Sequence, residues 1–104
     1  MHRERAKILK YEEPLGISRA ELHERFVKSY EEPVLIIDLH GIDLLDSTFL
    51  SELVQLRTHR NEHGLESGRL VIDSPYVRTA LNAVGLEYNW SVYESLDEAL
   101  ASVD

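Results

Sequence analysis

The chain has 104 residues, of which 43% are hydrophobic and 29% are charged, which suits one globular domain and excludes a disordered or collagen-like protein. With 11 Lys and Arg against 19 Asp and Glu, the formal net charge of -8 repels nucleic acid and anionic membrane surfaces. There is no cysteine and no apolar window of membrane-spanning length. We therefore expect a single domain over residues 1–104, located in the cytoplasm, with no nucleic-acid partner and no membrane insertion.

The first third of the chain carries signals for two strands and one helix. Residues 8–11 form a possible edge strand. A helix is expected over residues 18–30, because Ser18 and Glu21 form an S-x-x-E capping box at its start. Residues 34–39 are nearly all branched and apolar, which predicts a strand covered on both faces.

Strands and helices continue to alternate in the remainder of the chain. A helix is expected over residues 48–63, followed by a second buried strand over 70–73. Ser74 and Pro75 mark the start of a helix that extends to Val84. A weaker strand over residues 90–93 precedes a last helix, whose capping box begins at Ser95.

This alternation predicts an α/β fold. Strands joined through helices form right-handed crossovers and parallel pairs, so we expect strands 34–39 and 70–73 to be adjacent and parallel. The prediction is a mixed, mostly parallel β-sheet with about four α-helices. In such sheets functional sites lie beyond the carboxyl ends of the strands, which makes the loop over residues 40–48 the first candidate site.

The triplet Asp46-Ser47-Thr48 lies where this loop enters the next helix. The first turn of a helix offers unpaired N–H groups and the positive end of the dipole, which suit a hydroxyl cap or a phosphate on Ser47. Taken alone, the triplet is more simply explained as a helix start at which Ser47 or Thr48 is the cap.

A longer pattern surrounds the triplet and extends through the rest of the chain. It consists of Asp38-Leu39-His40-Gly41-Ile42, Leu45-Asp46-Ser47-Thr48 with Leu50, Leu70-Val71-Ile72-Asp73-Ser74-Pro75, Val77-Arg78, Leu81, Val84-Gly85-Leu86, Val92-Tyr93 and Ser95-Leu96-Asp97-Glu98-Ala99-Leu100. Together these segments resemble the STAS domains of the anti-sigma factor antagonist family. The resemblance covers roughly residues 15–103 and implies a STAS-type fold.

The resemblance also implies a protein switch with no cofactor. In similar bacterial proteins, a serine or threonine of this triplet is phosphorylated by a partner that is both a serine kinase and an anti-sigma factor, and a matching phosphatase is the second partner. The unphosphorylated domain binds the kinase and frees the sigma factor. By position the phosphoacceptor is Ser47, with Thr48 as second choice and Asp38 and Asp46 as neighbours. The implied partner-binding residues are Asp43, Asp46, Ser47, Thr48 and Phe49.

The sequence departs from the family pattern in two places. The family often reads D-S-S-G-L-G, whereas Phe49 and Ser51 occupy the two glycine positions here. Phe49 is either a core residue or a docking anchor, and the core is favoured because an aromatic residue at helical spacing is more often buried. Residues 12–17 show no clear equivalent of the family's second strand.

Other constellations indicate a function less directly. His59 and His63 have the spacing of a two-histidine metal site but lack the H-E-x-x-H arrangement. Four carboxylates at the sheet edge could form a magnesium site or an acid–base pair, although loop caps and solvated charge explain them more simply: Asp38, Asp43, Asp46 and Asp73. Glu12 and Glu13 are interpreted as part of a solvated acidic face.

Three functions remain open at this point. The leading hypothesis is an anti-sigma factor antagonist controlled by phosphorylation of Ser47, and the alternative is a non-switching scaffold subunit of a signalling or lipid-transport complex. A small enzyme that uses the carboxylate edge is the third. We expect no catalysis and no bound metal, because the sequence has no phosphate-binding loop, no G-x-S-x-G motif and no cysteine nucleophile.

Overall fold

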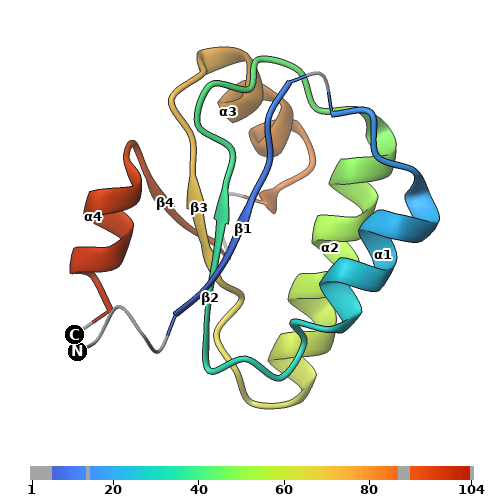
Figure 1. The fold of residues 1–104 in the computed structure, drawn as a ribbon, viewed down its shortest axis with the longest axis vertical. Helices are drawn as coiled ribbons and strands as arrows, with labels where there is room; N and C mark the ends of the chain where they lie inside the picture. The colour runs from blue at the N-terminus through green and yellow to red at the C-terminus, as the bar shows by residue number, and fades with distance from the viewer. Residues whose placement is uncertain (1–5, 14, 87–89, 104) are drawn as a thin grey trace.

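The computed structural model describes residues 6–13, 15–86 and 90–103. Four strands and four helices alternate in this part of the chain, in the order β1 (Ala6–Lys10), α1 (Arg19–Val27), β2 (Val34–Asp38), α2 (Ser47–Glu62), β3 (Arg69–Val71), α3 (Pro75–Ala83), β4 (Ser91–Tyr93) and α4 (Leu96–Ala101). The strands form one sheet in the order β1-β2-β3-β4 (Figure 1), and all three neighbouring pairs are parallel. The predicted α/β fold with β2 and β3 adjacent and parallel is therefore confirmed.

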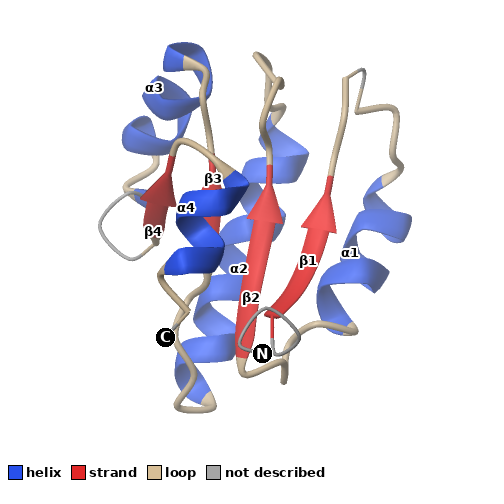
Figure 2. Ribbon diagram, turned by 60° about the vertical axis from the view of Figure 1, so that its left-hand side comes forward, coloured by secondary structure: helices blue, strands red, loops and turns tan. Residues whose placement is uncertain are grey.

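Helices cover both faces of the sheet. Helices α1, α2 and α3 pack against one face, and α4 packs against the other (Figure 2). Side chains alternate along β2, so Leu35 and Ile37 enter the larger core under α1 and α2, whereas Ile36 enters a smaller core with Val71 and Leu100. This alternation explains why β2 is apolar at consecutive positions, and it confirms that this strand is covered on both faces.

Serine side chains cap three of the four helices, as the sequence predicts. The hydroxyl of Ser18 accepts the N–H of Glu21 at 3.1 Å, and that of Ser95 accepts the N–H of Glu98 at the same distance. Ser74 caps α3 in the same way, with Pro75 as the first helical residue. These caps set where α1, α3 and α4 begin. In the described residues, no helix is both long and apolar enough to cross a membrane.

The connection between β1 and α1 is short and irregular. β1 lies at the edge of the sheet, which confirms the edge strand predicted near residues 8–11. Residues 12, 13 and 15–17 form no strand. Among the described residues of this connection, Glu13, Leu15 and Gly16 lie next to the loop between β2 and α2, at the carboxyl edge of the sheet.

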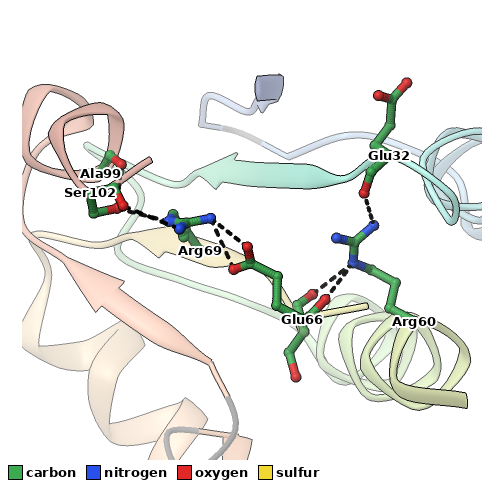
Figure 3. A network of polar contacts seen from close by, with 7 residues as sticks. Glu32, Arg60, Glu66, Arg69, Ala99 and Ser102 are labelled. Carbon is green, nitrogen blue, oxygen red and sulfur yellow. Dashed lines mark hydrogen bonds and ion pairs between the residues drawn. The ribbon is translucent and has the colours of Figure 1, made fainter. Parts of the chain in front are cut away.

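Arg60, near the end of α2, is a buried cation, although its charge is typical of a solvent-facing position on a helix. Its side chain is 0% exposed, and its Nε and Nη1 groups donate to the backbone carbonyl oxygens of Ser29, Tyr30, Glu32, Glu66 and Ser67. Figure 3 shows the contacts with Glu32 and Glu66. Burial lowers the pKa of the guanidinium, and the charges of Glu66 and Glu32 oppose that shift. Arg60 thus ties the turn after α1 to the loop before β3, at the edge of the sheet opposite the candidate site.

Arg69 makes a second polar connection, between β3 and the end of α4. Its Nη1 group donates to both carboxylate oxygens of Glu66 at 2.9 Å, and its Nε group donates to the hydroxyl of Ser102 at 2.8 Å (Figure 3). The Ser102 hydroxyl in turn donates to the carbonyl oxygen of Ala99. These contacts fix α4 against the sheet.

Candidate functional site

The candidate site is the loop between β2 and α2, at the carboxyl edge of the parallel sheet. Gly41 adopts a φ of +84°, a left-handed conformation that favours glycine over any other residue, and it turns the chain as it leaves β2. Ile42 and Leu45 are 0% and 7% exposed and anchor the loop in the core. Leu44, between them, is 76% exposed. The loop is therefore held at two points and presents a large apolar side chain to solvent.

Asp46, not Ser47 or Thr48, is the cap of α2. The Asp46 carboxylate accepts the N–H of Phe49 at 2.8 Å, and the helix begins at Ser47. This corrects the expectation that a hydroxyl of Ser47 or Thr48 caps the helix. A carboxylate suits this position because it satisfies an unpaired N–H group and faces the positive end of the helix dipole.

The two predicted phosphoacceptors differ in exposure. Ser47 is exposed at the first helical position, whereas Thr48 is partly buried. Because Asp46 provides the cap, the fold does not need the Ser47 hydroxyl for that purpose. Because it is also exposed, Ser47 is the more accessible of the two hydroxyls.

Asp43 and Asp46 lie in the loop that leads to Ser47, and both are exposed. Across the loop, a carboxylate oxygen of Glu13 accepts the N–H groups of Asp43 and Leu44, the latter at 3.1 Å. A pocket of about 290 Å³ beside the helix start is lined by Glu13, Leu15, Gly16, Leu44 and Asp46. Glu13 is therefore part of the site, and its interpretation as solvated charge alone is incomplete.

Asp38 does not belong with the other site residues. Its position in β2 has the same parity as Ile36, so its side chain points toward the face covered by α4, whereas α2 covers the opposite face. There it lines a pocket with Lys10, His40 and the first residues of α4, and it is 3% exposed. The expected role of Asp38 as a neighbour of the phosphoacceptor is therefore not supported by the geometry.

Phe49 is a core residue in this structure, with a side chain 1% exposed. Its ring packs edge-on between those of Tyr11 and Phe26, with centroids 5.3 and 5.9 Å away. Of the two interpretations left open by the sequence, this geometry favours the core. The expectation that Phe49 contacts a partner is therefore corrected, because its ring is buried and not accessible in this structure.

The carboxylates at the sheet edge bind backbone N–H groups. Asp38 accepts the N–H of His40 at 3.0 Å, and Asp73 accepts the N–H of Gly41 at 2.9 Å. The second carboxylate oxygen of Asp73 lies 3.3 Å from the His40 imidazole. Together with the Asp46 cap, these contacts confirm the simpler explanation of this acidic group, in which most of its members cap loops and a helix.

The histidine pair on α2 forms an aromatic stack. The ring of His59 lies between those of Tyr30 and His63, with centroids 3.9 and 4.4 Å apart respectively, and His63 Nδ1 is 2.8 Å from the carbonyl oxygen of His59. Over residues 6–13, 15–86 and 90–103, no three His, Cys, Asp or Glu side chains form a group able to hold a metal ion. The geometry thus gives His59 and His63 a packing role.

Comparison with known proteins assigns the family. A model of the STAS domain matches residues 2–99, nearly the whole chain. The chain belongs to the STAS domain family. The comparison with curated proteins gives no match.

Two solved structures share the fold of this STAS domain. One is the NMR structure of the protein TM1081, which superposes with a TM-score of 0.76 at 21% identity, over 96% of this chain and 82% of that one. The other is an anti-sigma-factor antagonist (STAS) domain protein from Planctomyces limnophilus, with a TM-score of 0.72 at 21% identity, over 92% of this chain and 88% of that one. At this level of identity the likeness establishes the fold.

The STAS domain also contains a buried carboxylate that was not predicted from the sequence. Glu52, on α2, is 2% exposed, and its two carboxylate oxygens lie 2.8 Å from His23 Nδ1 and 3.7 Å from Arg19 Nε, both on α1. The sequence does carry one indication of this burial, because Glu52 lies among the apolar residues that form the buried face of α2. Glu52 joins α1 to α2 one turn beyond the candidate site.

Proposed function

We propose that this STAS domain is an anti-sigma factor antagonist, a non-enzymatic module that binds an anti-sigma factor with serine kinase activity while Ser47 is unphosphorylated. The observation that carries the proposal is the position of Ser47. Its side chain is exposed at the first residue of α2, directly after a carboxylate cap and a loop with an exposed apolar residue, Leu44. A kinase can reach such a hydroxyl, and a partner can cover the same surface.

The charges around Ser47 explain how phosphorylation would end binding. A phosphate adds about 1.5 to 2 negative charges at neutral pH. Asp43, Asp46 and Glu13 already place three carboxylates around this loop. Burying a phosphate beside them in an interface costs desolvation and like-charge repulsion, so the partner is released.

The fold itself would tolerate the phosphate. Negative charge near the first turn of a helix interacts favourably with the helix dipole. Ser47 is also not the cap, so its modification leaves the hydrogen bond between Asp46 and Phe49 in place. The proposed switch therefore changes the surface and not the fold, and a phosphatase can restore the binding state.

Phosphosite mapping tests the proposal. The protein is incubated with ATP and a purified anti-sigma factor with serine kinase activity from the same organism, and any phosphate is located by mass spectrometry. We expect phosphate on Ser47 and none on Ser51, an exposed serine of the same helix that serves as an internal control. Phosphate on Thr48 would move the site by one residue.

Two variants of Ser47 extend the test to binding. Ser47→Ala is expected to bind the kinase constitutively, and Ser47→Asp to bind it more weakly while remaining folded. Because Asp carries one charge where phosphoserine carries nearly two, the effect of Ser47→Asp is expected to be smaller than that of the phosphate. If neither hydroxyl is modified and both variants bind like the wild type, a non-switching scaffold role replaces this proposal.

A further inference from the structure

The loop between β2 and α2 donates backbone hydrogen bonds to carboxylates from both neighbouring loops. Asp73, which follows β3, accepts the N–H of Gly41. Glu13, which follows β1, accepts the N–H groups of Asp43 and Leu44 through one carboxylate oxygen. Hydrogen bonds from N–H groups to an ionised carboxylate are stronger than those between neutral groups. The two outer loops therefore hold the central one from either side.

Glu13 stabilises the part of the loop that is not held by packing against the core. Ile42 and Leu45 are buried and fix the ends of a short segment, but Asp43 and Leu44 between them are exposed, and the Leu44 side chain is 76% exposed. Packing cannot define the conformation of two residues that project into solvent. The hydrogen bonds from their N–H groups to Glu13, 30 and 31 positions earlier in the chain, define it instead.

We propose that Glu13 is a positioning residue, which holds Asp43 and Leu44 in one conformation and so presents Leu44 and the start of α2 to the partner. The docking part of this inference rests on the proposed function, whereas the positioning part does not. A loop ordered before binding loses less conformational entropy on association. Releasing it should therefore weaken binding without unfolding the domain.

Amide hydrogen exchange, followed by NMR, tests the positioning directly and needs no partner. Glu13→Ala should raise the exchange rates of the Asp43 and Leu44 amides by about tenfold or more, as expected for local opening. The Phe49 amide, which is bound to Asp46, should be unaffected and serves as an internal reference. Glu13→Gln keeps an acceptor oxygen and should retain most of the protection.

Glu12→Ala is the matched control. Glu12 is exposed and carries the same charge one position earlier, so the control separates the contact from the loss of negative charge. It should leave the Asp43 and Leu44 amides protected. The midpoint of urea unfolding should be nearly the same for all variants, because the bonds involved are at the surface.

The binding measurement uses the same purified anti-sigma factor with serine kinase activity as the probe. Glu13→Ala should raise the dissociation constant several-fold, with Glu13→Gln and Glu12→Ala close to the wild type. Unchanged exchange at Asp43 and Leu44 overturns the positioning role, even where Ser47 is phosphorylated. Faster exchange with unaltered affinity overturns its contribution to docking. Failure of the wild type itself to bind the kinase or accept phosphate counts against the proposed function and leaves the exchange result standing.

Discussion

The ring of Phe49 meets that of Tyr11 edge-on, with centroids 5.3 Å apart and planes at 89°. The contact joins the first turn of α2 to the end of β1, next to the loop that carries the candidate site. Edge-to-face aromatic pairs of this kind stabilise a core by more than the burial of their apolar surface alone would. A large side chain at a position where related domains often have glycine is thus accommodated inside the protein, and the surface around Ser47 is left open.

Truncation of Phe49 should cost stability. Phe49→Ala removes a fully buried ring that packs between Tyr11 and Phe26, so we expect the free energy of unfolding to fall by about 3–5 kcal/mol. Urea unfolding followed by circular dichroism measures this. The exposed Leu44→Ala is the control, expected within about 0.5 kcal/mol of the wild type. Normal stability of Phe49→Ala together with lost partner binding would return Phe49 to the docking surface.

Arg60 should be equally difficult to replace. Arg60→Met leaves four of its five backbone carbonyl partners without this donor, since the carbonyl oxygen of Ser29 still accepts the N–H of Glu32. Each buried group left unsatisfied costs about 1–3 kcal/mol. We expect a loss of at least about 3 kcal/mol by urea unfolding, and a substantial loss for Arg60→Lys as well, because an ammonium cannot reproduce the planar fork. Arg57→Ala, on the same helix and partly exposed, should change little. A stable Arg60→Met protein would contradict this account.

Stability should fall at alkaline pH. Burial raises the pKa of Tyr11 above its ordinary value of 10.0, with the charge of Arg25 acting in the opposite direction. A raised pKa means that the folded state favours the neutral phenol. The contribution of Tyr11 to the free energy of unfolding is therefore complete below about pH 10, and it is lost as pH rises through the pKa of the folded state. Each unit of pKa difference is worth about 1.4 kcal/mol.

Urea unfolding at pH 8 and pH 11 measures this alkaline loss. The wild type should lose more stability over this interval than Tyr11→Phe, which has no phenol to ionise at that position. Burial also raises the pKa of Tyr30, so part of the loss should remain in the single variant. Identical losses in both proteins would show that Tyr11 ionises as freely in the folded as in the unfolded chain.

Asp46 should have two separable roles, as helix cap and as a negative charge beside the phosphate. Asp46→Ala removes the acceptor for the Phe49 N–H and should lower stability by about 1 kcal/mol. Asp46→Asn keeps a capping oxygen and should remain within about 0.5 kcal/mol of the wild type. Since Asn carries no charge, the phosphorylated Asp46→Asn protein should bind the kinase more tightly than the phosphorylated wild type. Equal affinities would exclude repulsion from Asp46 as part of the switch.

Local signals in the sequence predicted much of the fold. The caps at Ser18, Ser74 and Ser95 need only residues within one turn, and the continuous apolar run of β2 indicates burial on both faces. The cap at Asp46 was missed because three adjacent residues, Asp46, Ser47 and Thr48, can each fill that position. Which of the three is the cap depends on where the first helical residue falls after the buried Leu45, and this is set by the packing of the whole domain.

Contacts between distant residues account for what the sequence could not reveal. Glu13 reaches Leu44 across 31 positions, and Arg60 reaches Ser29 across 31, so neither pattern is visible in a local window. Asp38 is a different case. The alternation of side chains along β2 predicts that Asp38 lies on the face of Ile36, opposite α2, whereas the family pattern implies a position beside the phosphoacceptor; the structure agrees with the alternation.

Isothermal titration calorimetry with the phosphorylated and the unphosphorylated protein tests the central claim most directly. Both forms are titrated into the serine kinase that modifies Ser47, with Ser47→Ala carried through the same ATP treatment as the control. We expect phosphorylation to raise the dissociation constant at least about tenfold, equivalent to about 1.4 kcal/mol, and the treated Ser47→Ala protein to bind like the unphosphorylated wild type. Equal affinity of the phosphorylated and unphosphorylated forms would contradict the switch.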